Sequence, residues 1–243
     1  MGGYVTVTGI YQPCKWSADG TPTVLALPAG GTEGSLQAIN SSGVMAGYAK
    51  VTDVYQPCKW SVDGTPTVLA LPAEATEGAA TSINSSGVMA GYAKVTDVNQ
   101  PCKWSADGTP TFLDLPVGGT EGAINGINSS GVVAGYVDVA GAYQPCKWSA
   151  DGTPTFLDLP VGGTEGAING INSSGVVVGY VTVAGVDHAA IWLADGTAID
   201  AGTFGLDSAY FYGINDLGVV VGEKGNNDWS VELPIMAVPA TYN

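Results

Sequence analysis

Hydrophobic and polar positions along the chain alternate in short runs, each ended by residues that favour turns. Within residues 99–142, such runs lie at 100–105, 109–116, 123–128 and 132–137. Asp-Gly at 107–108 separates the first two runs, and Ser-Ser-Gly at 129–131 separates the last two. Asp-Gly between two such runs is a strong hairpin signal, and Ser-Gly is typical of a turn. The pattern predicts four short antiparallel strands.

The same pattern repeats every 44 residues over most of the chain. One cysteine stands in each of four copies, at Cys14, Cys58, Cys102 and Cys146. One tryptophan stands in each of five, at Trp16, Trp60, Trp104, Trp148 and Trp192. Ile-Asn-Ser-Ser-Gly begins at Ile39, Ile83, Ile127 and Ile171, with a degenerate fifth copy at Ile214. Residues 99–142 and 143–186 differ at only four positions, which indicates recent duplication or designed amplification.

Four-stranded units of about 40 to 50 residues in tandem are typical of β-propeller blades. We therefore expect an all-β propeller of about six blades, with the first and last incomplete and closing together; five blades is the alternative. The predicted repeats are approximately 11–54, 55–98, 99–142, 143–186 and 187–223, with an incomplete closing copy from 224–243 plus 1–10. A single repeat cannot bury both of its faces, so we predict one domain over 1–243.

Side-chain size predicts the order of the strands within a blade. The Ala-Ile-Asn strand carries small residues and suits the crowded propeller axis, while prolines at both ends of the Thr-Pro-Thr-Phe-Leu strand suit an edge. From inner to outer, we expect Ala-Ile-Asn, Val-Val-Ala-Gly-Tyr, Gln-Pro-Cys-Lys-Trp and Thr-Pro-Thr-Phe-Leu. The chain begins on a strand of the second kind, at 3–7.

Composition and charge exclude several classes of protein. The 36 glycines and 14 prolines leave no stretch suited to a long helix, and no run of apolar residues reaches the length of a membrane-spanning helix. The net charge is −15 with no basic cluster, so nucleic acid is not an expected partner. The first four residues lack the pattern of a signal peptide, so we expect any export signal to lie outside this sequence.

Glutamates at one position of four successive copies are the candidate binding residues. Each stands in Thr-Glu-Gly within the expected crossover loop between blades; they are Glu33, Glu77, Glu121 and Glu165. A carboxylate repeated once per blade on one rim could bind a cation, a sugar hydroxyl or a basic partner, and a solvated loop charge is the alternative. The aspartates of the hairpins are explained as turn formers; they are Asp19, Asp63, Asp107 and Asp151.

The cysteines, the tryptophans and the single histidine are interpreted as structural residues. Equivalent cysteines on neighbouring blades should lie farther apart than the about 7 Å that a disulfide allows, and no Cys-x-x-Cys offers a metal site. We expect buried thiols beside the tryptophans, with crosslinks between chains as the alternative. The tryptophans are predicted to be wedges between blades rather than sugar platforms. His188 is the only histidine, and Gln replaces it in four copies, which disfavours a catalytic triad.

A family resemblance rests on the fifth copy. Its His-Ala-Ala-Ile-Trp at 188–192 follows Ile-Asn-Ser-Ser-Gly-Val-Val-Val-Gly-Tyr at 171–180. This pairing resembles the HAF family of bacterial extracellular repeats, over essentially the whole chain. The first four copies depart from it, because Gln-Pro-Cys-Lys-Trp stands where the family has His-Ala-Phe-Leu-Trp. The resemblance implies an extracellular or cell-surface location and a propeller-like fold, and it supplies no catalytic residue.

Near-identical repeats favour binding over catalysis. Catalysis needs unlike groups that converge on one point, whereas these repeats present the same groups at equal intervals. We therefore expect a non-enzymatic extracellular scaffold for structure or protein interaction, with no catalytic residue, metal or cofactor. The alternative is a lectin-like module with one weak carbohydrate site per blade, and an enzyme ranks third. Self-association is a further option.

Overall fold

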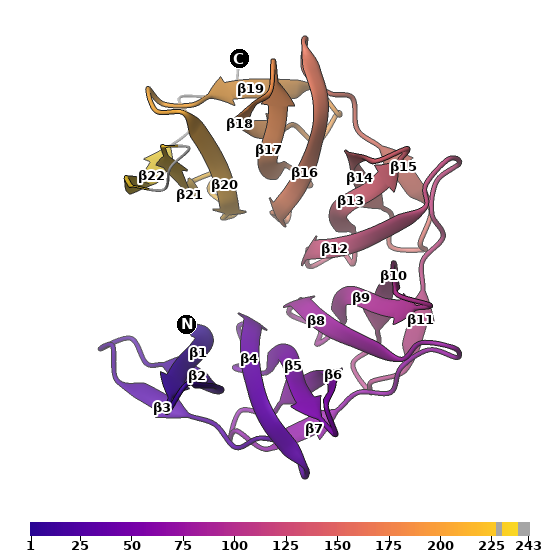
Figure 1. Cartoon of the computed structure of the whole chain (residues 1–243), viewed down its shortest axis with the longest axis vertical. Helices are drawn as coiled ribbons and strands as arrows, with labels where there is room; N and C mark the ends of the chain where they lie inside the picture. The colour runs from indigo at the N-terminus through magenta and orange to yellow at the C-terminus, as the bar shows by residue number, and fades with distance from the viewer. Residues whose placement is uncertain (227–229, 238–243) are drawn as a thin grey trace. The chain divides into compact units, whose positions relative to one another are not determined.

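All regular structure in the described residues, 1–226 and 230–237 of this computed structural model, is β-strand. The strands form six antiparallel sheets, four with four strands and two with three. Strands follow one another in chain order within every sheet (Figure 1), which is the meander of a propeller blade. The fold is therefore a β-propeller with six blades, as the repeat predicts. Within these residues, no helix has the length and apolarity to cross a membrane.

The sheets belong to two compact units, and the first unit is Met1–Leu113. Its first sheet contains β1 (Gly2–Val7), β2 (Ile10–Trp16) and β3 (Pro22–Val24). Its second contains β4 (Gly31–Ile39), β5 (Met45–Val51), β6 (Val54–Trp60) and β7 (Pro66–Val68). Its third contains β8 (Glu77–Ile83), β9 (Met89–Val95), β10 (Val98–Trp104) and β11 (Pro110–Phe112).

The second unit, Asp114–Asn243, holds the other three sheets. The fourth sheet contains β12 (Glu121–Ile127), β13 (Val133–Val139), β14 (Ala142–Trp148) and β15 (Pro154–Phe156). The fifth contains β16 (Gly163–Ile171), β17 (Val177–Val183), β18 (Val186–Trp192) and β19 (Ala198–Gly202). The sixth contains β20 (Ser208–Ile214), β21 (Val220–Gly225) and β22 (Glu232–Ala237). That 1–243 forms one domain stays a prediction.

Each four-stranded sheet has the strand order predicted from side-chain size. In the fourth sheet, β12 and β13 come from the second half of the copy 99–142, and β14 and β15 come from the first half of the copy 143–186. A blade therefore joins halves of two successive sequence repeats, as expected if the Gly-rich segment connects blades.

The first and last sheets are incomplete, as predicted. In the first sheet, β1 takes the place of a second strand, because Gly3 pairs with Cys14 as Gly91 pairs with Cys102 in the third sheet. The last sheet has no strand beyond β22 in the residues that the structure describes. The joining of 224–243 with 1–10 stays a prediction, and the sixth tryptophan, Trp229, lies outside the described residues.

One glycine in each second strand lets the first two strands approach closely. A Cβ on Gly135 would lie 1.9 Å from the carbonyl oxygen of Ala123, so a side chain cannot fit there. The neighbouring strand β12 carries a bulge between Ile124 and Gly126. The Val-Ala-Gly-Tyr motif thus encodes the close pairing of these two strands.

Buried tryptophans fill the space between consecutive copies and bond to the copy before their own. The indole N–H of Trp104 donates to the carbonyl of Ala70 at 2.8 Å, and that of Trp60 donates to Ala26 at 2.9 Å. The same bond recurs from Trp148 to Asp114 and from Trp192 to Asp158. These four indoles are fully buried, which confirms the prediction of wedges, whereas Trp16 in the first sheet is only half-buried.

The cysteines are free and buried, as predicted. Cys58 belongs to a hydrophobic cluster with Trp60, Met45, Leu36 and Leu25. Burial raises the pKa of the Cys58 thiol to about 12, so the thiol stays protonated and unreactive at neutral pH. Its position is that of a small hydrophobe.

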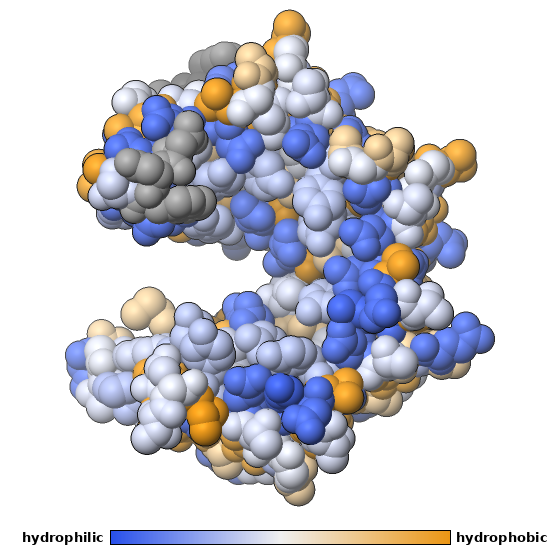
Figure 2. All heavy atoms as spheres, in the orientation of Figure 1, coloured by the Kyte–Doolittle hydropathy of each residue, from blue (hydrophilic) through white to orange (hydrophobic). Residues whose placement is uncertain are grey.

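Polar and neutral residues make up most of the face of each unit that is seen in Figure 2, and hydrophobic residues appear there as scattered spots. Scattered exposed hydrophobic residues of this kind are normal for protein surfaces.

Candidate functional site

The four candidate glutamates lie in strands, and their predicted place in crossover loops is wrong. Glu33 is in β4, Glu77 begins β8, Glu121 begins β12 and Glu165 is in β16. The loop is shorter than predicted because a turn closes early: the N–H of Gly119 donates to the carbonyl of Pro116 at 2.9 Å. The N–H of Thr120 then donates to the carbonyl of Asp138 at 3.0 Å, which starts the strand pairing before the glutamate.

In the first unit, lysines on the adjacent strand neutralise the glutamates. Glu77 lies opposite Lys94, with 2.5 Å between Oε1 and Nζ, and hydrogen bonding to Glu77 raises the pKa of Lys94. Glu33 lies opposite Lys50 at 3.9 Å and also accepts a hydrogen bond from the Tyr55 hydroxyl at 3.0 Å. Both pairs are partly exposed, so each contributes at most about 1 kcal/mol to stability.

In the second unit, the lysine is replaced by Asp138 and Thr182. Asp138 lies opposite Glu121, and it accepts hydrogen bonds from the Thr120 hydroxyl at 3.1 Å and the Gly141 N–H at 3.0 Å. Within 1–226 and 230–237, Glu121 is in no ion pair. Like charges directly opposite on neighbouring strands repel, so this position favours a bound cationic group.

The same edge of the fifth sheet carries two more carboxylates. Glu165 accepts the backbone N–H of Tyr143 at 3.4 Å, and Asp187 accepts the Tyr210 hydroxyl at 2.6 Å. Burial, followed by the charges of Asp187 and Glu165, raises the pKa of Tyr180 to about 12. We call Glu121, Asp138, Glu165 and Asp187 the acidic edge of the second unit.

The only histidine forms a pair that the sequence did not predict. His188 lies in β18, and its Nδ1 is 2.8 Å from Oδ2 of Asp200 in β19. Asp200 also accepts the Gly202 N–H at 2.8 Å. Asp200 stands in an outer strand without a regular repeat, so no spacing pointed to it. The contact ties two neighbouring strands together.

The hairpin aspartates form turns, as predicted. Ser149 donates its hydroxyl to Asp151, whose Oδ1 also accepts the Thr153 N–H at 3.1 Å. These hydrogen bonds lower the pKa of the Asp151 carboxyl, with Ser149 as the larger cause. The same arrangement recurs at Asp19, Asp63 and Asp107.

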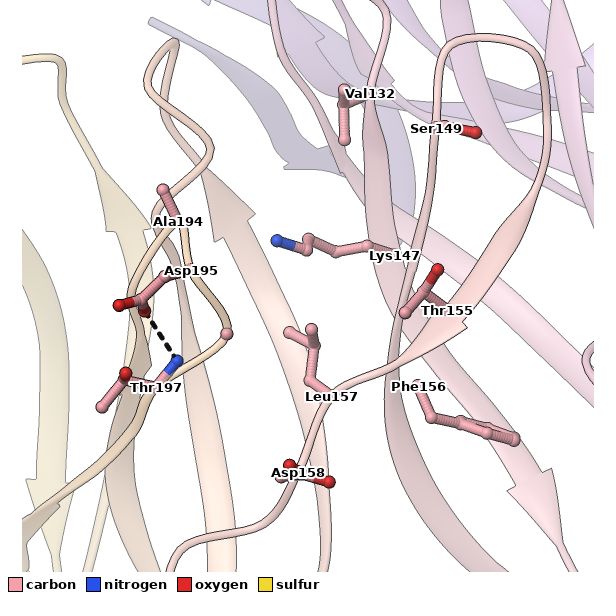
Figure 3. A pocket seen from close by; sticks show the side chains of 11 residues that line it. Val132, Lys147, Ser149, Thr155, Phe156, Leu157, Asp158, Ala194, Asp195 and Thr197 are labelled. Carbon is pink, nitrogen blue, oxygen red and sulfur yellow. Dashed lines mark hydrogen bonds between the residues drawn. The ribbon is translucent and has the colours of Figure 1, made fainter.

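A cavity of about 670 Å³ lies between the fourth and fifth sheets of the second unit (Figure 3). Lys147 and Asp158 line it from the fourth sheet and the segment after it, and Asp195 and Thr197 line it from the turn before β19. Sequence reasoning missed this site, because residues of adjacent copies meet there. One feature of the sequence could have indicated it: Leu193 stands where the other hairpin turns have the serine of Ser-x-Asp-Gly.

No protein-family model and no curated protein matches the sequence. Among solved structures, the chain is similar to TolB from Acinetobacter baumannii (TM-score 0.62, 14% identity), and the match covers 93% of this chain and 60% of that one. It is also similar to a putative TolB from Agrobacterium tumefaciens (TM-score 0.62, 12% identity, 97% and 85% covered). A virginiamycin B lyase from Staphylococcus aureus is similar as well (TM-score 0.56, 13% identity, 99% and 85% covered). These likenesses show the propeller fold alone.

Proposed function

We propose that this chain is a non-enzymatic extracellular interaction scaffold that binds a basic segment of a protein partner at its acidic edge. The observation that carries the proposal is the replacement of the neutralising lysine: Lys94 faces Glu77 in the first unit, whereas Asp138 faces Glu121 in the second. The extracellular location is supported by the resemblance to HAF repeats.

Differences between the two nearly identical copies support a functional role for this edge. Four positions distinguish 99–142 from 143–186. At three of them, Asn99 is replaced by Tyr143, Asp138 by Thr182, and Ala142 by Val186. In the structure, 138–143 form the β13–β14 hairpin at this edge, and the Tyr143 N–H contacts Glu165. Three of the four changes thus lie where a partner would bind, and the fourth, from Ala134 to Val178, lies at a buried packing position.

Charge supplies the attraction for such a partner. The chain carries −15, and the acidic edge has carboxylates without neutralising lysines. A field of one sign speeds association with an oppositely charged partner and weakens as salt is added. Binding at this edge is therefore expected to be salt-dependent.

One observation supports the lectin-like alternative. The rings of Tyr136 and Tyr143 lie 4.6 Å apart between centroids at the same edge, and aromatic faces of this kind can stack on sugars. The repeated tryptophans cannot serve this purpose, because four of them are fully buried. A sugar site would therefore have to use tyrosines.

Fluorescence anisotropy with a labelled decalysine peptide tests the scaffold proposal. Asp138→Lys, which restores the residue type of the first unit, and Glu121→Gln should each weaken binding severalfold at low salt. Glu77→Gln is the matched control and should leave the affinity unchanged, because Glu77 is already neutralised by Lys94. Equal losses in all three variants, or binding of neutral oligosaccharides with no binding of the peptide, would overturn the proposal, and the second result would favour the lectin-like alternative.

A further inference from the structure

One lysine of the second unit lacks the hydrogen bond that its equivalents make. Lys15 Nζ donates to the carbonyl of Val62 at 2.9 Å, and Lys59 Nζ donates to that of Ala106 at 3.1 Å. Each reaches the hairpin turn of the next sheet. Lys147 extends toward the corresponding turn at Ala194 (Figure 3), but its ammonium makes no hydrogen bond or ion pair with any described residue.

The turn that Lys147 faces differs from the others. In the regular turns, a serine hydroxyl donates to the aspartate, as Ser61 does to Asp63. Leu193 replaces that serine, and Asp195 has Thr197 as its hydrogen-bonding partner, through an N–H at 2.9 Å. The exposed carboxylate of Asp195 is therefore available to a ligand.

The two opposite charges face each other across an open cavity. Lys147 is half-buried, and its charge interacts with that of Asp195, yet the two groups are more than 4.0 Å apart, beyond an ion pair. Burial lowers the pKa of Lys147, and the charge of Asp195 offsets this only in part. A half-buried charge in this position is stabilised by a ligand that carries the opposite charge.

The equivalent place in the first unit lacks these features. A smaller cavity of about 350 Å³ lies between residues 23–26 and the turn at 63–66. There Lys15 is already bonded to Val62, and Ala26 stands where the second unit has Asp158. The cavity of the second unit is therefore the larger of the two, and it alone of the two has a lysine without a hydrogen bond to any described residue and an aspartate at position 158.

We propose that the cavity at Lys147 binds a free α-amino acid as a zwitterion, with its carboxylate on the Lys147 ammonium and its ammonium on the Asp195 and Asp158 carboxylates. The two charges of an α-amino acid are adjacent, and they complement the charges that face each other across the cavity. Thr155 and Thr197 supply hydroxyls, and Leu157 supplies an apolar surface for the side chain.

Other small ligands match the cavity less well. A phosphate dianion would be attracted by one lysine but repelled by two aspartates. A neutral sugar could use the threonine hydroxyls, but it would leave the half-buried ammonium without a counter-charge. A simple amine would satisfy the aspartates and add positive charge next to Lys147. Only a ligand that carries both charges provides a counter-charge for Lys147 and for the two aspartates.

Calorimetric and NMR titrations of the whole protein test this assignment with three probes: L-alanine, acetate and ethylammonium. L-alanine should bind at least tenfold more tightly than either single-charge probe, with shifts at the amides of 194–197. Equal binding of acetate and L-alanine would reduce the cavity to an anion site, and the absence of L-alanine binding at millimolar concentration would overturn the proposal.

Variants with matched controls complete the test. Lys147→Met should abolish L-alanine binding, whereas Lys59→Met should not, because that ammonium is bonded to Ala106. Lys147→Arg keeps the charge and should retain measurable binding, which guards against a folding defect as the cause of loss. Leu193→Ser restores a hydroxyl partner for Asp195 and should weaken binding severalfold. Loss of binding in Lys59→Met as well would contradict the assignment.

Discussion

The indole N–H of Trp104 donates a hydrogen bond of 2.8 Å to the main-chain carbonyl of Ala70, which lies just after the outer strand of the preceding sheet. Trp104 is fully buried in a cluster that includes Leu69 of that sheet and Met89 of its own. One side chain thus fills the space between two sheets and satisfies a backbone acceptor at their junction.

Replacement of Trp104 by Ala should lower the free energy of unfolding by about 3–5 kcal/mol, because a large buried side chain is lost. Trp104→Phe should cost less, since the ring remains, but the Ala70 carbonyl loses its donor. Trp16→Ala is the matched control and should cost clearly less, because Trp16 is only half-buried. Urea unfolding measures all three. Equal costs at positions 16 and 104 would contradict the role of Trp104 as a wedge.

Replacement of Gly135 by Ala should destabilise the protein by about 1–3 kcal/mol or more, because the new methyl group would overlap the Ala123 carbonyl and push the strands apart. Gly213→Ala is the control, since a Cβ there would lie 3.5 Å from its nearest neighbour, an ordinary contact. Gly135→Ala should therefore have a lower melting temperature than Gly213→Ala. A tolerated Gly135→Ala would show that the first two strands are not as close as described.

Stability should decline at alkaline pH because of the buried thiols. Burial raises the pKa of Cys58, Cys102 and Cys146 from 9.0 to about 12. Between these values the folded chain keeps protons that the unfolded chain releases, so the free energy of unfolding falls as the pH rises. Replacing the three cysteines by Ala, the residue at the matching position 190, should flatten this dependence. Urea unfolding over that pH range provides the measurement, and an unchanged slope would assign the decline to tyrosines.

The serine of a hairpin turn should control the titration of its aspartate. Ser149→Ala removes the larger cause of the lowered pKa of Asp151, so this pKa should rise toward 3.8. The lowered pKa means that the stabilisation is present above 3.8 and is lost as the pH falls below it. Carboxyl NMR titration measures the change. Asp195, whose turn has Leu193 instead of serine, is the internal control, and its pKa should not move.

Much of the fold could be predicted from the sequence because the determining signals repeat. The Asp-Gly and Ser-Gly turns mark the strand ends in every regular copy, and a recurrent Trp beside a Cys points to a buried face. The placement of Glu121 was missed because it depends on a turn closed by Gly119 and Pro116, which shortens the loop by a few residues. Composition alone does not reveal that turn.

The candidate site was harder to predict because its residues come from different copies. The positions of Glu33 and Glu121 in their repeats are the same, but their chemistry differs through Lys50 and Asp138 on the adjacent strand. Lys147 meets a turn of the following sheet, and only the three-dimensional arrangement shows that its hydrogen bond is missing. Departures from the repeat were the informative positions.

The tryptophan bond also bears on how such a gene changes length. Each regular copy supplies a donor to the copy before it and an acceptor carbonyl to the copy after it, as Trp104 and Asp114 do on either side of 99–142. If a misaligned recombination inserts one 44-residue period, the inserted copy carries both the tryptophan donor and the carbonyl acceptor that its new junctions need. Growth by whole periods therefore needs no compensating mutation at those junctions.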